Sequence, residues 1–177
     1  SNILVNWNVR QSLIDISKEK KFTKFIIKLS AFFSSTVDRI VYNSTFSAET
    51  HEDIGFNKNK TTIIYNGFDI EKFIPNSNKE DIRQHYGIDS DKFLVGMIAR
   101  YHPMKDHTNM INAAIILLNR KTRNYHFMFV GEGVKNIIDE IPEKHQRNFS
   151  LVNAVLEVEK ILPIFDINVL SSWNEGF

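Results

Sequence analysis

Phe93-Leu-Val-Gly-Met-Ile-Ala99 and Tyr125-His-Phe-Met-Phe-Val130 are the two stretches that decide the fold class of this chain. Each is a continuous apolar run of strand length. Residues 106–121, which lie between them, repeat apolar side chains at the spacing of one helix face. Strands that are apolar on both sides are typical of parallel sheets whose two faces are covered by helices. The region therefore predicts a strand, a crossover helix and a second, parallel strand.

The alternation continues on both sides of this region and predicts an α/β fold with parallel sheets. Further strands are expected at residues 3–7, 38–42, 61–65, 149–152 and 167–171, and further helices at 22–33, 47–54, 80–86, 134–141 and 155–165. The strand at 3–7 is expected to be buried. Between residues 73 and 79 the composition changes to Pro75-Asn-Ser-Asn78, which is typical of a linker between domains.

The composition excludes several classes of function. The 177 residues hold 22 Lys and Arg against 21 Asp and Glu, so the overall charge gives no reason to expect a nucleic-acid partner. Cys is absent, which excludes disulfides and thiolate metal sites and fits a reducing compartment such as the cytoplasm. No apolar run reaches the roughly 18–20 residues that span a bilayer. The chain starts at Ser1 and stops at Phe177, where a helix is expected, so we expect an internal fragment.

Two cationic residues lie where a parallel sheet binds ligands, at the carboxyl ends of its strands. Arg100 follows the strand at 93–99, and Lys105 precedes a helix whose first turn presents free backbone N–H groups. Two cations and a helix N-terminus can bind a multiply charged anion such as a diphosphate without a metal. The alternative, equally compatible with the spacing, is a pair of solvated surface charges.

Glu175-Gly176-Phe177 forms a second candidate site. A carboxylate that follows a strand can accept hydrogen bonds from sugar hydroxyls, and glycine lets the backbone approach a ligand. A loop Glu that starts a helix is the alternative. Gly131 and Gly133 fit a plain strand-to-helix turn better than an NAD fingerprint. Gly96 fits a packing position, or less well a close approach to a ligand.

The histidines and serines do not form a recognisable catalytic or metal site. The six histidines show no metal-ligand spacing, and we interpret His102 and His107 as polar loop or capping residues. No serine lies in a G-x-S-x-G elbow, so no catalytic triad is assigned. We therefore predict no metal site.

Five motifs occur in the order that is typical of glycosyltransferase family 4, the group 1 transferases, which the chain resembles from about residue 38 to its end. They are Arg39-Ile-Val-Tyr-Asn-Ser44, Ile63-Ile-Tyr-Asn-Gly-Phe-Asp69 with Phe73-Ile-Pro75, Gly96-Met-Ile-Ala-Arg100 with Lys105-Asp-His107, Val130-Gly-Glu-Gly133, and Asp166-Ile-Asn-Val-Leu-Ser-Ser172 with Glu175-Gly-Phe177. Each motif is modest alone, whereas five in order are specific.

The resemblance implies a GT-B fold, with two Rossmann-like domains that face each other and that are both incomplete here. Residues 1–72 would end the N-terminal, acceptor-side domain, 73–80 would be the linker, and 81–177 would form the donor nucleotide-sugar-binding domain without its C-terminal end. The family typically retains the anomeric configuration and needs no divalent metal, so no cofactor is expected. The expected donor is a nucleoside-diphosphate sugar, with a UDP-sugar as the preferred candidate, and the expected acceptor is a saccharide or a lipid-linked glycan. Peripheral membrane association is expected only through regions outside this sequence.

The resemblance also implies roles for single residues. Arg100 and Lys105 match the cations that bind the donor diphosphate and stabilise the leaving group. Glu175 matches the first Glu of the E-x7-E motif, which faces the donor sugar, whereas the second Glu would fall beyond Phe177. Further donor contacts are expected from Gly96, Gly131, Gly133, Gly176 and Phe177.

Two loops depart from the family pattern. Many relatives have His after the first strand, where this chain has Trp7-Asn-Val-Arg10. We expect Asn8 and Arg10, together with Asn66 and Gly67, to line the acceptor cleft, with Arg10 meeting an anionic acceptor or the donor phosphate. An Arg that caps a sheet edge is the alternative. The family often has Gly after the strand at 149–152, where Asn153-Ala154 stands here, so nucleobase contacts in that loop are not assigned.

Three other functions compete with a transferase. A nucleotide-sugar epimerase has a similar fold, and the continuation of the E-x7-E motif would favour the transferase over it. An NAD-dependent oxidoreductase is disfavoured because the glycine pattern at 131–133 is incomplete. An inactive nucleotide-sugar-binding fragment is the third possibility, and we expect the 177 residues alone to transfer little or no sugar.

Overall fold

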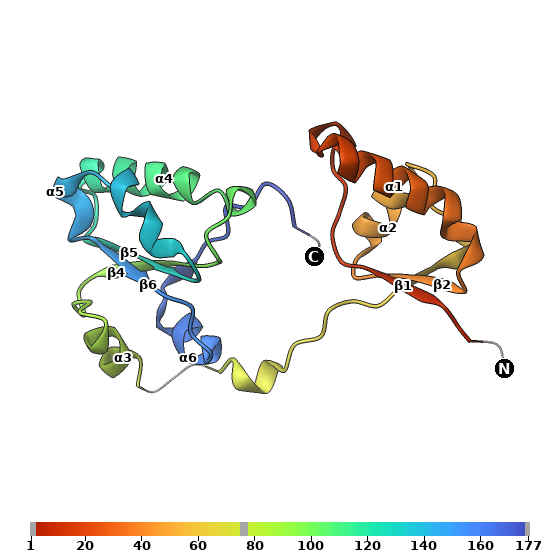
Figure 1. Ribbon diagram of the computed structural model, residues 1–177. Helices are drawn as coiled ribbons and strands as arrows, with labels where there is room; N and C mark the ends of the chain where they lie inside the picture. Colours follow the sequence, from red (N-terminus) through yellow and green to blue (C-terminus); the bar gives the residue numbers. More distant parts are fainter. Residues whose placement is uncertain (1–2, 75–77, 176–177) are drawn as a thin grey trace. The chain divides into compact units, whose positions relative to one another are not determined.

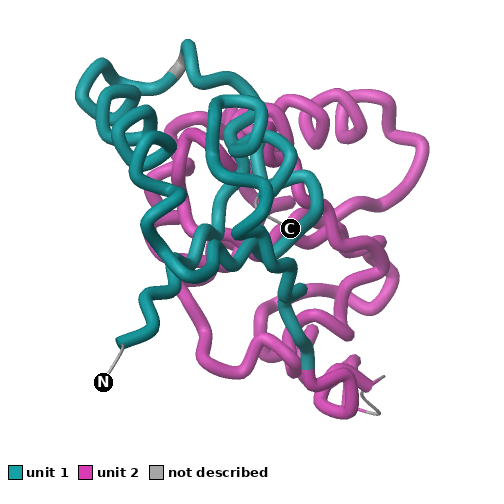
Figure 2. The backbone as a smooth tube through the Cα atoms, turned by 90° about the vertical axis from the view of Figure 1, so that its right-hand side faces the viewer, with its two compact units in different colours: residues 1–68, 174–177 teal, residues 69–173 magenta. Residues whose placement is uncertain are grey.

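The computed structural model describes residues 3–74 and 78–175 (Figure 1). It divides into two compact units, Ser1–Phe68 with Asn174–Phe177, and Asp69–Trp173, which are coloured separately in Figure 2. Each unit is built on a parallel sheet with helices, which confirms the predicted α/β class. The linker predicted at residues 73–80 includes residues 75–77, which lie outside the described residues.

The first unit holds a three-stranded parallel sheet in the order β1-β2-β3. The strands are β1 (Asn6–Val9), β2 (Arg39–Tyr42) and β3 (Thr61–Ile63), and the helices between them are α1 (Lys21–Phe33) and α2 (Thr45–Glu52). Both helices lie on the same face of the sheet (Figure 1). Ser44 caps α2, because its hydroxyl accepts a hydrogen bond from the Ser47 amide at 3.1 Å.

The first strand differs from the prediction of a buried strand at residues 3–7. It runs instead over Asn6–Val9 and, among the described residues, pairs only with β2. Ile3 is 85% exposed, and Leu4 and Val5 are exposed as well. An apolar run predicts a buried strand only if another element covers it, and within the described residues nothing covers this run. Asn8, which we expected in the following loop, therefore lies in the strand itself.

The second unit holds a four-stranded parallel sheet in the order β6-β5-β4-β7. Its strands are β4 (Phe93–Ile98), β5 (Tyr125–Val130), β6 (Phe149–Val152) and β7 (Ile167–Asn168), and its helices are α3 (Lys79–His85), α4 (His107–Arg120), α5 (Glu143–Gln146) and α6 (Val158–Ile161). The helices α4 and α5 cover one face of the sheet, and α3 and α6 cover the other (Figure 1). The inner side chains of β4 and β5, such as Leu94, Met97, Phe127 and Phe129, are almost completely buried.

Two predicted helices of this unit differ from the structure because of proline. The helix predicted at 155–165 is α6 followed by a 3₁₀ turn at Leu162–Ile164, since Pro163 has no N–H to continue the α-helix. The helix predicted at 134–141 is a 3₁₀ segment, Val134–Glu140, which stops before Pro142. The short helix α5 follows that proline and was not predicted. Further 3₁₀ turns occupy Ile16–Lys18, Ser34–Thr36, Lys58–Lys60, Ile70–Lys72 and Pro103–Lys105.

An ion pair between the buried Arg83 and the more exposed Asp166 joins three parts of the second unit. The guanidinium of Arg83 on α3, which is 3% exposed, donates to the carboxylate of Asp166 at 2.8 Å and to the Ile164 carbonyl at 2.7 and 3.0 Å. The same carboxylate also accepts from the Leu94 amide at 2.7 Å and from Lys79 at 3.0 Å. Helix α3 is thereby fastened to β4 and to the segment that leads into β7.

The helices are too short or too polar for a membrane span. Within residues 3–74 and 78–175, none has the length and apolar character needed to cross a bilayer.

Candidate functional site

The carboxyl ends of β4, β5 and β6 meet at one edge of the second sheet. Beyond the regular strands, the Ala99 amide donates to the Val130 carbonyl at 2.9 Å, and the Gly131 amide donates to the Val152 carbonyl at 3.0 Å. A cavity of about 230 Å³ lies here. It is lined by Ile98, Ala99, Arg100, Val130, Gly131, Glu132, Ala154, Val155 and Val158. This is the edge at which open α/β sheets bind their ligands.

Two of the predicted site residues, Arg100 and Gly131, line this cavity, and three of the other lining residues lie outside every motif recognised in the sequence. Ala154, Val155 and Val158 come from the loop after β6 and from the start of α6. They form an apolar wall opposite the end of β4. The signal that could have found them is the loop at Asn153-Ala154, which was recognised in the sequence but given no role.

Gly131 has a packing reason to be glycine. A Cβ built on it would lie 2.2 Å from the carbonyl oxygen of Ala99 and 2.9 Å from the amide nitrogen of Arg100. Both atoms belong to the backbone, which cannot move away as a flexible side chain could. The absence of a side chain at position 131 therefore lets the end of β5 approach the end of β4, where Arg100 begins its loop.

We expect Gly131→Ala to destabilise the second unit by about 1–3 kcal/mol, because the added methyl group must push the Ala99–Arg100 backbone out of place. Thermal and urea unfolding measure the change. Gly67→Ala is the matched control, because a Cβ at Gly67 meets nothing within 4 Å, and its effect should stay within about 0.5 kcal/mol. Equal stabilities for the two variants would contradict this account of position 131.

Gly96 lies in the middle of β4 rather than at its end. A Cβ at this position would lie 2.1 Å from the ring of Phe165, so the aromatic ring fills the space of the missing side chain. The structure thus supports the packing interpretation of Gly96, whereas its expected contact with the donor stays a prediction.

Lys105 ends a 3₁₀ turn, Pro103–Lys105, in the loop between β4 and α4. His102 caps this turn as predicted, since its Nδ1 accepts from the Met104 amide at 3.2 Å. Asp106 follows in the left-handed conformation, with φ 51° and ψ 53°, and its carboxylate caps α4 by accepting from the Asn109 amide at 3.2 Å. Left-handed backbone is unfavourable for a residue other than glycine, although Asp tolerates it better than most. Arg100 is exposed, Lys105 is half-buried, and both lie in this one loop.

Glu140 fastens this loop to the rest of the unit, and sequence reasoning missed it. Its carboxylate accepts from the Tyr101 hydroxyl at 3.2 Å and from the Thr108 hydroxyl at 2.7 Å. The negative charge of Glu140, and then its hydrogen bond, raise the pKa of the Tyr101 hydroxyl. Tyr101 and Glu140 are 39 residues apart in the sequence, so no local pattern could have indicated the contact.

His107 corrects a prediction, because it is not a polar capping residue. It is the first residue of α4, is 2% exposed, and packs its ring against Tyr101 and Phe129 at centroid distances of 5.5 and 6.0 Å. Burial lowers the pKa of the imidazole, although the Ala99 carbonyl opposes this effect. Neither ring nitrogen has a partner with hydrogen-bond geometry in the described part of the chain. The ring is therefore part of the packing beneath the loop.

The segment after β7 runs alongside the Lys105 loop. The Ser171 hydroxyl is within 2.9 Å of the carbonyl oxygens of both Lys105 and Asp106, to which it donates. The Trp173 backbone amide donates to the Met104 carbonyl at 3.1 Å, and the indole N–H donates to the Pro103 carbonyl at 3.2 Å. These contacts hold the start of the Ser171–Phe177 motif against the turn that ends with Lys105.

The remaining predicted residues of this motif either belong to the first unit or lie outside the described residues. Glu175 belongs to the first unit, where its backbone carbonyl accepts from the Ser12 hydroxyl at 3.0 Å. Gly176 and Phe177 are not among the described residues, so their predicted donor contacts remain predictions.

Gly133, with φ 76°, caps the 3₁₀ segment after β5 and needs the left-handed region that glycine adopts without cost.

A second polar cluster lies at the carboxyl ends of the strands in the first unit. The Arg10 guanidinium, just after β1, donates to the side-chain oxygen of Asn66 at 3.1 Å, just after β3. Between them, the buried Asn43 follows β2 and donates to the Arg10 carbonyl at 3.4 Å. The structure thus brings together Arg10 and Asn66, two of the four predicted cleft residues. Gly67 is exposed beside Asn66, and Asn8 is exposed on β1.

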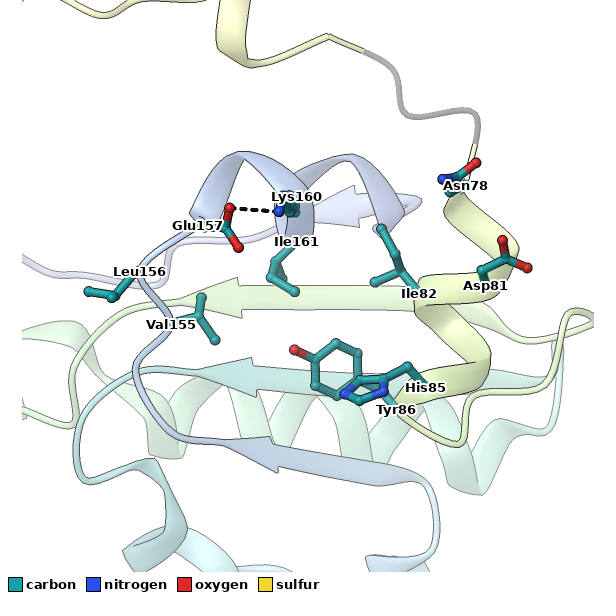
Figure 3. Close-up of a pocket in the computed structure, with 10 residues that line it drawn as sticks. All are labelled: Asn78, Asp81, Ile82, His85, Tyr86, Val155, Leu156, Glu157, Lys160 and Ile161. Atoms are coloured by element: carbon teal, nitrogen blue, oxygen red, sulfur yellow. Dashed lines mark ion pairs between the residues drawn. The ribbon is translucent and has the colours of Figure 1, made fainter.

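A larger cavity of about 650 Å³ lies between α3 and the α6 region, away from the predicted residues (Figure 3). Ile82, Tyr86, Val155 and Ile161 point into it, whereas Leu156 points away. Val155 is the one lining residue that this cavity shares with the cavity at the strand ends. We place the candidate site at the smaller cavity, because only that one contains a predicted cation and lies at the carboxyl ends of the strands.

No metal centre is found among the described residues. Residues 3–74 and 78–175 contain no group of three or more His, Cys, Asp or Glu side chains that could hold a metal ion. The candidate site of the second unit therefore consists of a cationic loop, glycine backbone and an apolar wall. A parallel α/β unit with such a site at its strand ends is typical of proteins that bind nucleotides.

Comparison with known proteins defines the family. Residues 78–177 match the glycosyl transferases of group 1, and this match covers more than half of the chain, which therefore belongs to that family. The matched region contains the whole cavity at the strand ends. Of the predicted cations, Arg100 and Lys105 both lie within it.

Relatives and solved structures agree with this assignment. EpsF of Bacillus subtilis (strain 168), named as a glycosyltransferase, is 28% identical over an alignment of 152 residues that covers 77% of this chain and 38% of that protein. The Escherichia coli UDP-Gal:alpha-D-GlcNAc-diphosphoundecaprenol alpha-1,3-galactosyltransferase is 26% identical over an alignment of 170 residues that covers 90% of this chain and 43% of that protein. The crystal structure of Anabaena HepE with UDP and glucose superposes with a TM-score of 0.80 at 19% identity and covers 98% of this chain.

The structural match confirms the GT-B fold and shows that this chain corresponds to only part of it. The chain spans 48% of HepE and less than half of the two curated relatives. Activity, substrates and partners of the whole protein are accordingly matters of inference.

Proposed function

We propose that the protein is a retaining glycosyltransferase that moves a sugar from a UDP-sugar to a saccharide or lipid-linked acceptor, and that the second unit binds the donor. The observation that carries this proposal is the family match over residues 78–177, which includes the cationic loop and the cavity at the strand ends. In this assignment residues 81–177 form the donor-binding domain, 73–80 the linker, and 1–72 part of the acceptor-side domain.

The choice of UDP and of the acceptor is supported by the relatives. HepE was crystallised with UDP and glucose, and the Escherichia coli relative is named for a UDP-galactose donor and a diphosphoundecaprenol-linked acceptor. The cavity of about 230 Å³ is smaller than a whole nucleotide sugar needs, so it would hold one part of the donor while the rest extends along the cationic loop. The apolar wall of Ala154, Val155 and Val158 suits a nucleobase.

The proposed chemistry depends on charge. As the bond between the sugar and the diphosphate breaks, negative charge grows on the leaving phosphate. Arg100 and Lys105 would stabilise that charge, so that no divalent metal is required. Glu175 would accept hydrogen bonds from the donor sugar and orient it. In the first unit, Arg10 and Asn66 would bind the acceptor, since they are polar, paired and placed at the strand ends.

Binding of UDP to the 177-residue chain tests the donor site. We expect isothermal titration calorimetry to show tighter binding of UDP than of uridine, because only UDP carries the phosphates that Arg100 and Lys105 contact. Arg100→Gln should weaken UDP binding roughly ten- to hundredfold, the range expected for loss of a charged hydrogen bond, with little effect on uridine.

Arg123→Gln is the matched control for this experiment. Arg123 is an exposed cation of the same unit, but it precedes β5 and lies at the opposite edge of the sheet. It should therefore leave UDP affinity unchanged. Equal weakening by both substitutions would mean that UDP responds only to overall charge, and the proposed donor site would be wrong. The affinities of GDP and ADP in the same assay show whether the site distinguishes uracil from other bases.

A further inference from the structure

Helix α1 carries an apolar surface that faces away from the core of its unit. Ile27 and Ala31 pack against the core, which also contains Ile40 and Tyr42 of β2. The exposed apolar side chains of the helix are Phe22, Phe25, Ile26, Leu29, Phe32 and Phe33. They follow the spacing of a helix face, and Phe22 and Phe32 are 75% and 78% exposed. We call this set the α1 apolar face.

The charges on the same helix all have one sign. Its sequence from Lys21 to Phe33 contains three lysines and no acidic residue, and Lys20 precedes it directly. Lys20, Lys21 and Lys28 are exposed, and within the described residues none of the three forms an ion pair. Lys24 is half-buried and donates to the Ser17 carbonyl. The lysines thus border the α1 apolar face with uncompensated positive charge.

We propose that the α1 apolar face binds the surface of an anionic lipid bilayer. A helix with Phe and Leu on one side and Lys beside them can lie in the plane of a membrane, with the rings among the acyl chains and the ammonium groups at the lipid phosphates. This places membrane binding on described residues, whereas the sequence alone led us to expect it only in regions outside this chain.

The lysines of α1 favour a bilayer over a second copy of the chain as the surface that covers the α1 apolar face. Two α1 apolar faces packed against each other would bring the bordering lysines of both helices close together without any acidic partner on either helix. A bilayer that contains anionic lipids covers the apolar side chains and neutralises the lysines at the same time. Bulky aromatic rings also suit the interface between headgroups and acyl chains.

Vesicle co-sedimentation of the 177-residue chain tests the proposal. We expect it to bind vesicles made of phosphatidylcholine with roughly one third phosphatidylglycerol, and to bind pure phosphatidylcholine much more weakly. Phe25→Ser with Phe32→Ser should reduce binding roughly tenfold or more, since two rings leave the bilayer. Lys21→Gln with Lys28→Gln should reduce binding to the anionic vesicles by a similar factor and remove its sensitivity to salt.

Two control variants keep the test specific. Ile116→Ser with Leu156→Ser removes two exposed apolar side chains of the second unit, and Lys121→Gln with Lys144→Gln removes two of its lysines. Both should bind as the parent does. Circular dichroism checks that every variant is folded, which is expected because all the substituted side chains are exposed or lie in loops.

Four results would overturn the proposal. The first is no binding of the parent to anionic vesicles. The second is equal loss in the α1 variants and in the controls. The third is a concentration-dependent dimer, seen without lipid, that the Phe25 and Phe32 substitutions abolish, because a second copy would then cover the face. Binding by this chain but not by the protein at its native length would also count against it, since another part of the protein would then be the occupant.

Discussion

Replacing Arg83 by methionine is expected to lower the free energy of unfolding of the second unit by about 2–3 kcal/mol, the range for losing hydrogen bonds to a charged group. The guanidinium is 3% exposed and contacts Asp166, the Ile164 carbonyl and the Lys92 carbonyl. Methionine fills a similar volume but donates no hydrogen bond. Lys79, which stays in place at 3.0 Å from Asp166, keeps the loss from being larger.

The effect of Arg83→Met should depend on pH with a definite sign. Burial by itself would raise the pKa of Asp166, but hydrogen bonds from the Leu94 amide, Lys79 and Arg83 outweigh it and lower the pKa below its ordinary 3.8. A lowered pKa in the folded state contributes stability above pH 3.8, which is lost as the pH falls through the lowered value. The difference between parent and variant should therefore shrink in acid.

Urea unfolding at a series of pH values measures both effects. Arg120→Met is the matched control, because Arg120 is exposed at the end of α4 in the same unit, and its effect should stay within about 0.5 kcal/mol. A change below about 1 kcal/mol for Arg83→Met at neutral pH would show that the ion pair does not hold α3 in place. A difference that grew in acid would show that Asp166 is not its partner.

Alanine in place of either Arg100 or Lys105 is expected to lower kcat roughly 10²–10³-fold in the protein at its native length, the range for losing one group that stabilises charge in a transition state. Both side chains would act on the leaving diphosphate, so the loss should appear in kcat rather than only in KM. Arg100→Lys should recover only part of the rate, because Lys cannot bind a phosphate with two parallel hydrogen bonds.

Steady-state transfer from a UDP-sugar, with separate kcat and KM values, measures this prediction. Arg123→Ala serves as the control and should leave both constants unchanged. Arg10→Ala should raise KM for the acceptor without changing donor binding. EDTA should leave the rate unchanged, because Arg100 and Lys105 take the place of a divalent metal. Values of kcat within about threefold of the parent for both Arg100→Ala and Lys105→Ala would remove the proposed role of the loop, a factor worth less than 1 kcal/mol.

The central part of the second sheet was predictable because its signal is local and strong. The continuous apolar runs at β4 and β5 leave one interpretation, a doubly covered parallel strand, and the helix between them has a clear apolar stripe. The cap at Ser44 was predictable for the same reason, since a capping side chain acts on an amide three residues away. The strand-end rule then indicated the loop of Arg100 without knowledge of any contact.

Other features could not be predicted because they depend on contacts between distant residues. The spacing of α1 reveals an apolar stripe, yet only the packing of Ile27 and Ala31 shows that a different side of the helix meets the core. Glu140 reaches Tyr101 and Thr108 from another element, and Arg83 reaches Asp166 over 83 residues. His107 was assigned by its polar chemistry, whereas the ring is buried between two aromatic side chains.

The ring of Phe165 in the space beside Gly96 links two positions that must change together. Any side chain at 96 would displace the ring, and a smaller side chain at 165 would leave a void beside the glycine. Related sequences that carry alanine or serine at the first position should therefore carry a smaller residue than phenylalanine at the second. Since Phe165 lies two residues before β7, which leads to Ser171, a mismatched pair would also disturb the segment held against the Lys105 turn.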